Sequence, residues 1–283
     1  MKKIVIRLTN LLVPILFLTP LIFTFYASLL SPDQVSRLHT YKLPYYLSPY
    51  QYFDLIFVKN EYFSLFLNSV KITFWVILGQ LVISVLAAYG LAKIKTKYAI
   101  IVVSIYVFAL LLPQQLMIIP NMIAYDLLYR LTSIKLLDSH MAIILPGVFS
   151  TLGVIYIRYV IMTLPDEIIE AARIDGASEL VIIVRIVVPN IKGALFAMIA
   201  LVFLEYWNVI EQGVVFLDSL SKFPVSVYLK HMHDTDINAY FASAVIYCLP
   251  IIVAFGASRK KLRRSRKEMV DMKKLLKAGE YDE

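Results

Sequence analysis

Long apolar stretches with few charged residues alternate with shorter polar segments along most of the chain. Six of them lie at about residues 8–30, 66–92, 99–120, 141–162, 194–217 and 239–257. A helix needs roughly 20 apolar residues to cross the hydrocarbon core of a bilayer, which is about 30 Å thick. The stretches lack the alternation of barrel strands, and backbone groups in lipid must be satisfied within the protein. We therefore predict an all-α integral membrane protein with six transmembrane helices.

The composition supports a membrane protein and excludes several other classes. Hydrophobic residues make up 60% of the 283 residues and charged residues 17%, whereas soluble domains average about 45–50% and 25%. The single cysteine, Cys248, excludes a disulfide framework and a cysteine-based zinc site. The pattern G-x-x-x-x-G-K-[ST] is absent, so this chain is not itself a P-loop ATPase. We expect no catalytic site and no metal site.

The net charge of +8 is distributed in a way that predicts the orientation in the membrane. Lys and Arg gather at the N-terminus, in the 93–98 connection and after residue 257. Cytoplasmic segments carry such an excess, so both termini and the loops 93–98 and 163–193 should be cytoplasmic. Loops 31–62, 121–140 and 218–238 should face outside. We expect a transmembrane domain over 1–257 and a basic cytoplasmic tail over 258–283. The tail should lie near anionic lipid headgroups, and no nucleic-acid partner is needed to explain its charge.

The cytoplasmic loop 163–193 is more than a plain connection. Pro165 suits the start of a helix, Gly176 suits a left-handed helix end, and Pro189 marks the end of a second helix at about residue 188. The small residues Ala171 and Ala172 would let another backbone come close. These features predict a two-helix knob that docks in a groove of another protein. An ordinary amphipathic helical hairpin explains the same residues equally well.

The loop also carries a known motif. Glu170, Ala171 and Ala172 are followed after three residues by Gly176, and after nine more by Ile186-Val-Val-Pro189. This resembles the EAA loop of ABC-importer permeases, with Val188 in place of the usual leucine. Further similarity to carbohydrate-type permeases, such as the maltose-system G subunit, lies in Phe66–Ser69, Ala87–Ala92 and Trp207-Asn208. The resemblance covers roughly residues 60–215, and the basic tail departs from the glycine-rich tail of that group.

The resemblance implies a type I ABC importer permease fold with a cytoplasmic coupling helix, in a bacterial plasma (inner) membrane. It implies two cytoplasmic ATPase subunits, a second permease subunit and an extracytoplasmic solute-binding protein as partners. ATP and Mg²⁺ would bind the ATPase subunits, and this chain would hold no cofactor. The residues implied in ATPase coupling are Glu170, Ala171, Ala172, Asp175, Gly176 and Pro189. Closure of the ATPase pair would then drive alternating access for a sugar or oligosaccharide.

Charged and polar residues inside the apolar stretches are the candidates for a translocation path, because charges within a span usually face a cavity or the protein interior. Glu205 lies beside Trp207 and Asn208, and sugar sites combine an aromatic face with polar groups. Arg158 lies near the cytoplasmic end of its stretch. A buried polar network between helices explains Glu205, Trp207 and Asn208 equally well. Snorkelling of the side chain to the membrane interface explains Arg158.

Two other functions fit parts of the sequence. An ion-coupled secondary transporter would use Glu205 and Glu211 and would need no ATPase, but it leaves the EAA motif unexplained. An ABC permease for a solute other than a sugar would keep the motif. Co-purification of an ATPase and the ATP dependence of uptake would distinguish these possibilities.

Overall fold

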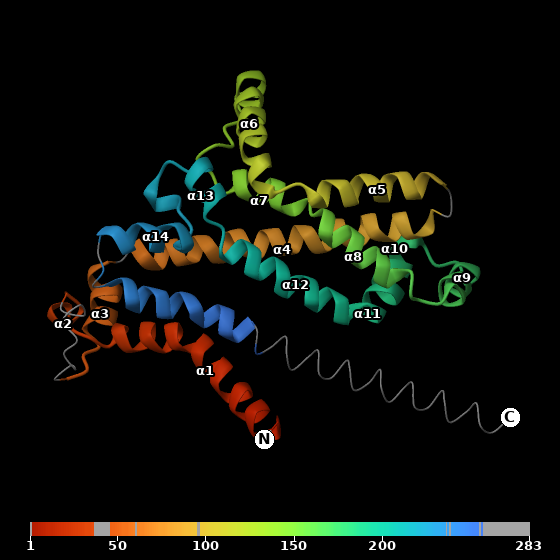
Figure 1. Cartoon of the computed structure of the whole chain (residues 1–283). Helices are drawn as coiled ribbons and strands as arrows, with labels where there is room; N and C mark the ends of the chain where they lie inside the picture. Colours follow the sequence, from red (N-terminus) through yellow and green to blue (C-terminus); the bar gives the residue numbers. More distant parts are fainter. Residues whose placement is uncertain are drawn as a thin grey trace.

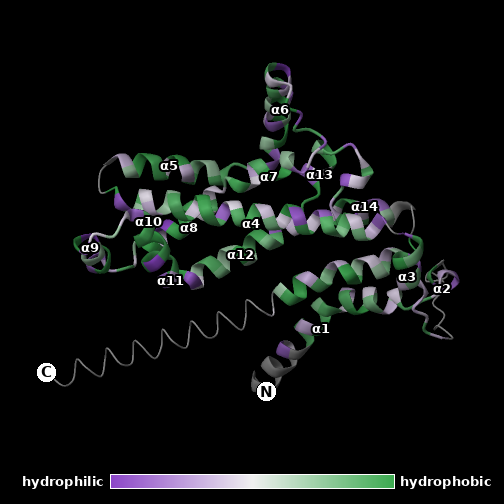
Figure 2. Cartoon of the chain, turned by 180° about the vertical axis from the view of Figure 1, so that it is seen from behind, coloured by the Kyte–Doolittle hydropathy of each residue, from purple (hydrophilic) through white to green (hydrophobic). Residues whose placement is uncertain are grey.

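The computed structural model of the chain describes residues 2–36, 46–59, 61–94, 97–235, 237, 239–254 and 256. These residues form helices and connecting turns, without a β-strand among them. Figure 1 shows several long helices lying side by side, with shorter helices at both ends of the bundle. Figure 2 shows hydrophobic residues along α4, α5 and α12, and more hydrophilic residues at α9. The expected tail 258–283 lies outside the described residues.

Helix α4 (Glu61–Lys93) is the centre of the bundle, and α7 (Met141–Val148), α8 (Thr151–Ile161) and α12 (Lys192–Trp207) pack against it. Small residues allow these helices to approach closely, as is common inside membranes. A Cβ built on Gly153 would lie 2.6 Å from Ser84 Oγ, and one on Gly79 would lie 2.4 Å from a Val148 methyl carbon. The close packing of α4 with α7 and α8 therefore depends on glycine at these two positions.

The third apolar stretch is not one straight helix. Helix α5 (Lys97–Leu111) ends before Pro113, and the chain continues through the 3₁₀ helix η3 (Gln114–Met117) into α6 (Ile118–Thr132). The two parts are bent by 97°, and α6 stands away from the long helices in Figure 1. The expected uninterrupted helix 99–120 is therefore wrong. A residue before proline is pushed out of the helical region, which explains the break at Leu112.

The fifth apolar stretch also differs from the expectation of one helix over 194–217. Helix α12 ends at Trp207, and a separate short helix, α13 (Glu211–Phe216), follows. At its other end α12 is bent by 80° from the segment Glu179–Asn190. This segment consists of α10 (Glu179–Ile182), the π-helix η4 (Ile183–Val187) and α11 (Val188–Asn190). Pro189 lies inside α11 and does not end the segment at residue 188, because a proline in the first turn of a new helix needs no N–H.

The predicted outside loops are partly helical. The segment after α13 contains η5 (Leu220–Lys222) and α14 (Val225–Thr235), where a loop over 218–238 was expected. Asp138 holds this segment to the turn before α7: its carboxylate accepts bonds from the Ser219 N–H at 2.9 Å and from Lys222 Nζ at 2.6 Å. These bonds keep the pKa of Asp138 well below its ordinary value, with the Lys222 bond as the largest cause.

The two ends of the described chain lie next to each other. Helix α1 (Lys2–Ser28) is followed by α2 (Pro32–Ser36), α3 (Tyr50–Phe53) and the π-helix η2 (Asp54–Val58). The last helix, Ala239–Ala254, is the blue unlabelled one in Figure 1. The buried side chain of Gln51 donates to the carbonyls of Ala27 and Leu30 at 2.8 and 2.9 Å and accepts from the N–H of Ala242. Gln51 thus joins the end of α1 to the last helix.

By length and composition, two helical segments of the described chain could each cross a membrane: Glu61–Lys93 and Met141–Ile161. Two bent pairs could each form one broken span, Tyr98–Leu111 with Gln114–Thr132 and Glu179–Asn190 with Lys192–Trp207. Leu12–Ser28 and Ala239–Ala254 are shorter apolar helices.

Candidate functional site

The loop with the EAA motif forms two helices joined by a tight turn. Helix α9 (Asp166–Ile174) ends at Asp175, and Gly176 has a φ of +80°. The N–H of Gly176 bonds to the Arg173 carbonyl and the N–H of Ala177 to the Ala172 carbonyl, both at 3.0 Å. This pair of bonds is a Schellman motif, in which the left-handed position favours glycine. The predicted role of Gly176 as a helix end is confirmed.

Side chains tie the loop to the adjacent end of α4. Arg173 Nε lies 2.8 Å from Glu179 Oε1, and the hydroxyl of Tyr89 donates to the other oxygen of Glu179. Lys93 Nζ lies 3.5 Å from Asp166 and 5.8 Å from the ring centroid of Tyr89. Arg173, and then Tyr89, lower the pKa of Glu179. These contacts place α9 and α10 beside the end of α4, although exposed ion pairs contribute little stability.

Helix α9 is attached to the protein along one side and open on the other. Ile169 is buried in the main hydrophobic cluster, and Ala172 packs against that cluster. Glu170 and Ala171 are exposed, and Ile174 is 87% exposed at the end of the helix. Glu170 forms no hydrogen bond or ion pair with the residues that the structure describes. These residues leave one side of α9 open to another protein.

A second candidate site lies where three helix interruptions meet. The chain leaves helical geometry after Leu111, at Phe149–Ser150 and after Trp207. Such irregular backbone at membrane depth is tolerated where it is buried in protein or lines a water-filled cavity. Two adjoining cavities of about 240 and 420 Å³ lie there, and both are lined by Gln114, Glu205, Tyr206 and Gln212. We refer to the two together as the polar cavity.

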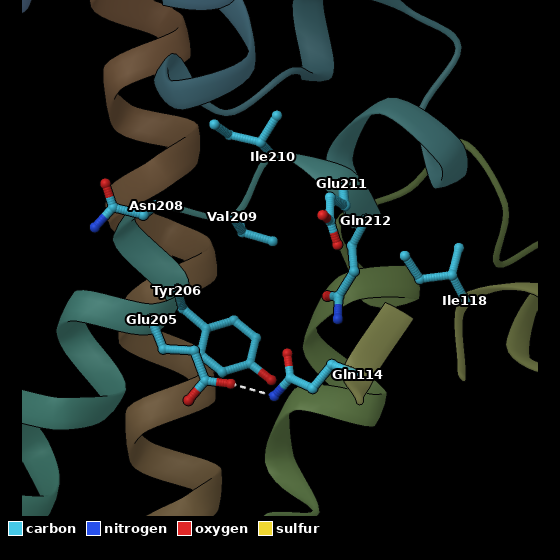
Figure 3. A pocket seen from close by; sticks show the side chains of 9 residues that line it. All are labelled: Gln114, Ile118, Glu205, Tyr206, Asn208, Val209, Ile210, Glu211 and Gln212. Carbon is cyan, nitrogen blue, oxygen red and sulfur yellow. Dashed lines mark hydrogen bonds between the residues drawn. The ribbon is translucent and has the colours of Figure 1, made fainter. Parts of the chain in front are cut away.

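Figure 3 shows how side chains from different helices surround the smaller part of the polar cavity. The amide nitrogen of Gln114, from η3, donates to Glu205 of α12. The ring of Tyr206 reaches toward the same place, and Glu211 and Gln212 extend from α13. Asn208 lies at the edge, where its amide donates to the Leu204 carbonyl at 2.7 Å and accepts from the Tyr247 hydroxyl. Glu205 and Asn208 are thus brought to one cavity.

Trp207 does not line the polar cavity, which corrects the expectation that its ring faces the path. It is 1% exposed, and its ring stacks on Phe203 and Tyr247 at centroid distances of 5.4 and 5.7 Å. Phe66 of α4 meets it edge-on at 5.3 Å, and its Nε1 donates to the Tyr247 carbonyl at 3.2 Å. Trp207 therefore joins α12 to α4 and to the last helix.

Arg158 is not brought together with Glu205 either. Its Nε donates to the carbonyl of Leu91 at 3.3 Å, in the last turn of α4. The last four carbonyls of a helix have no partner within the helix, and a cation there also interacts well with the helix dipole. Arg158 caps the end of α4 near the EAA loop and does not line the polar cavity.

Several residues of both sites were missed by sequence reasoning. Gln80 and Gln114 are uncharged, so a count of charges within spans passes over them; a polar side chain inside a long apolar run was the available signal. Tyr89 and Glu179 join α4 to the loop across a long separation in sequence, which no local pattern reveals. No group of three or more possible metal ligands occurs among the described residues.

The comparisons with known proteins agree with the fold and the motif. A profile of the family described as "Binding-protein-dependent transport system inner membrane component" matches residues 80–267. The arabinooligosaccharides transport system permease protein AraQ of Bacillus subtilis (strain 168) is 30% identical over 198 residues, which are 69% of this chain and 68% of that protein. The sn-glycerol-3-phosphate transport system permease protein UgpE of Shigella flexneri is 31% identical over 147 residues, which are 52% of this chain and 50% of that protein.

Among solved structures, a bacterial ABC transporter involved in the import of the acidic polysaccharide alginate has the same fold. Its chain superimposes with a TM-score of 0.77 at 23% identity, and the match covers 91% of this chain and 96% of that one. Because the family profile covers well over half of the sequence, the assignment does not depend on this structure. The chain belongs to the family of inner membrane components of binding-protein-dependent transport systems.

Proposed function

We propose that this chain is the membrane-spanning permease subunit of an ATP-driven, binding-protein-dependent importer for a sugar or oligosaccharide. Family membership favours an ABC permease over an ion-coupled secondary transporter. The names of the relatives leave the solute open within a class of hydroxylated molecules: AraQ is named for arabinooligosaccharides and UgpE for sn-glycerol-3-phosphate. The proposed partners are cytoplasmic ATPase subunits, a second permease subunit and an extracytoplasmic solute-binding protein. ATP and Mg²⁺ would bind the ATPase subunits.

The observation that carries the proposal is the exposed knob formed by α9 and its Schellman turn. Glu170, Ala171 and Ile174 present the surface that docks in a cleft of the ATPase subunit. Asp175 and Gly176 give the turn its shape, and Ala172 accepts one of its two bonds. Pro189 lies in the first turn of α11 at the far end of the loop, next to the bend into α12.

The coupling in this proposal is mechanical. Closure of the ATPase pair moves α9, and the contacts of Glu179 and Asp166 with α4 transmit that movement to the bundle. The permease then changes between inward-facing and outward-facing states. A ligand shifts such an equilibrium only by its difference in affinity for the two states, so docking of ATP-bound ATPase must favour one of them.

Six membrane crossings are part of the same proposal. Two single helices, the bent pair Tyr98–Leu111 with Gln114–Thr132, helix α12 of the second bent pair and two shorter apolar helices supply them, with the EAA loop, the basic tail and both termini on the cytoplasmic side. The 97° bend places α6 across the direction of α5, so the third crossing is made by a broken segment.

The proposal is tested by purifying the tagged chain from its native membrane in mild detergent. We expect an ATPase and a second permease to co-purify and uptake by the reconstituted complex to require ATP. Ile174→Asp should lose the ATPase and keep normal insertion, because the side chain is almost fully exposed in the free chain. Ile134→Asp, at an exposed isoleucine of the predicted outside loop, is the matched control. A chain that purifies alone, or an Ile174→Asp variant that keeps both ATPase and uptake, contradicts the proposal.

A further inference from the structure

We propose that the polar cavity binds the transported solute and selects hydroxylated solutes that are uncharged or positively charged over anionic ones. The inference rests on the proposed function, since it assumes that a solute passes this point. It adds a property that the family leaves open, because the transporters of the comparison are named for arabinooligosaccharides, for a phosphate ester and for an acidic polysaccharide.

The first observation is that two glutamines of the cavity wall each have a buried oxygen without a hydrogen-bond partner in the described structure. Gln80 is 2% exposed, and its Nε2 donates to the Gly147 carbonyl at 2.6 Å. A carbonyl can only accept, so the amide nitrogen must face it, and Oε1 is left on the other side. That oxygen has no partner, although Gln80 lines the larger part of the cavity. Gln212 Oε1 is also buried without a partner in the described structure.

Buried acceptors without partners are costly, and a ligand that donates hydrogen bonds removes that cost. The groups that can donate to them are water, the hydroxyls of a sugar and an ammonium group. A carboxylate or phosphate oxygen cannot, because it is itself an acceptor. Both oxygens are buried in residues that line the cavity, so a donor-rich ligand is favoured where these side chains turn toward it.

The second observation is the sign of the charge. Glu205 and Glu211 line the smaller part of the cavity, and Glu205 also lines the larger part. The lining of both parts, within the described chain, contains no Lys, Arg or His. Neither glutamate forms an ion pair with a described residue. Both side chains are exposed, so these two carboxylates without a nearby cation leave a negative field in the cavity.

The location supports access by a solute. Three interrupted helices end at the cavity, and interrupted helices near the middle of the membrane commonly form solute sites in transporters. The larger part, at about 420 Å³, falls in the size range of small-molecule sites. The ring of Tyr206 packs against Gly147, where a Cβ would lie 2.8 Å from the ring, and its hydroxyl end faces Gln114. Tyr206 thus adds an aromatic edge and a hydroxyl to the carboxylates and amides.

The charge of the cavity can be measured without knowledge of the natural solute. Cys248 is the only cysteine and is first replaced by serine. Ile118→Cys then places a thiol in the lining, and Ile134→Cys places one on the outside loop as a control. Each is reacted, in the full transporter complex, with the cation trimethylammonioethyl methanethiosulfonate and with the anion sulfonatoethyl methanethiosulfonate. The measured quantity is the ratio of the cation rate to the anion rate.

We expect this ratio to be roughly tenfold larger at Ile118→Cys than at Ile134→Cys, because a cleft with low-dielectric walls focuses the field of its charges. The combined Glu205→Gln and Glu211→Gln changes should remove the excess. Should that variant fail to fold, added salt must reduce the ratio in the unchanged cavity. Equal ratios at the two positions, a ratio that persists without the carboxylates and in high salt, or no reaction at Ile118→Cys would overturn the proposal.

Protection then tests the solute itself. A trimer of glucosamine, and less strongly a trimer of galactose, should slow labelling of Ile118→Cys, whereas a trimer of galacturonic acid should not. Protection by the acidic trimer, or by none of the three, would contradict selection in this cavity. The proposed function fails separately: a complex without an ATPase would contradict it, whatever the labelling ratio.

Discussion

The backbone at Gly176 makes a quantitative prediction about coupling. Its φ of +80° lies in the left-handed region, and a Cβ built there meets no atom within 4 Å. Gly176→Ala therefore introduces backbone strain without a steric clash. A non-glycine residue in this region costs about 1–2 kcal/mol, which corresponds to a factor of about 5 to 30 in an equilibrium between two loop shapes.

The strain weakens docking if the ATPase subunit binds only the native shape of the turn. The apparent dissociation constant rises as the fraction of binding-competent loop falls, so Gly176→Ala should weaken ATPase binding by up to that factor. Gly176→Asn should weaken ATPase binding less than Gly176→Ala does, because asparagine tolerates the left-handed region better than alanine. The measurement is a titration of purified ATPase onto the permease pair in lipid nanodiscs, together with uptake by the complete complex.

Gly90 provides the matched control. A Cβ on Gly90 also meets nothing within 4 Å, but its backbone is helical, within α4. Gly90→Ala should leave ATPase binding unchanged and stabilise the helix by about 0.5–1 kcal/mol. The reasoning is refuted if Gly176→Ala binds the ATPase as tightly as the wild type, or if Gly90→Ala weakens binding to the same degree.

Three further predictions concern the rest of the site. Tyr89→Phe removes the bond to Glu179 and should lower ATP-driven uptake with little change in the melting temperature; unchanged uptake would mean that this contact does not transmit movement. Trp207→Ala leaves a void among its stacked neighbours and should destabilise the chain by about 3–5 kcal/mol, measured by denaturant unfolding, without altering the charge preference of the cavity. Asp138 has a pKa lowered from 3.8, so its contribution to stability should be complete at neutral pH and disappear as the pH falls below 3.8 through the folded-state pKa. Melting temperatures of the wild type and Asp138→Asn should therefore differ at pH 7 and converge in acid, and a constant difference would exclude the bond to Lys222 as the cause.

The turn of the EAA loop could be predicted from sequence because it depends on one local property. Only glycine adopts a left-handed backbone without strain, and Gly176 follows a helix with acidic residues in its first turn and Arg173 in its last. Both the turn and its place in the EAA motif are therefore visible in a short stretch of chain. The structure adds the contact of Glu179 with Tyr89 of α4, which joins residues far apart in sequence and so cannot be predicted from the loop alone.

The helix breaks could not be predicted from hydropathy. The apolar pattern continues through Pro113 and through Asn208, so a window of apolar residues gives one helix in each case. At Asn208 the side chain bonds to the Leu204 carbonyl and to the hydroxyl of Tyr247. The first is a local bond that competes with the helix, which is a known effect of asparagine, but the second comes from another helix. The burial of Trp207 could not be predicted for a related reason: besides Phe203 of its own helix, the rings that enclose it belong to α4 and the last helix.

Helix α4 links the two candidate sites. It carries Tyr89 and Lys93 at the coupling loop and Gln80 at the polar cavity, and near its other end Asn68 donates to the Ser221 carbonyl at 2.9 Å. Its 33 residues form one uninterrupted helix, about 50 Å long at 1.5 Å per residue. The helices that pack against it around the cavity are all interrupted there. Under the proposed function, a displacement applied at the loop is carried along α4 as a unit, while the neighbours bend at their breaks. That difference in stiffness is the reason we expect the change of shape at the cavity.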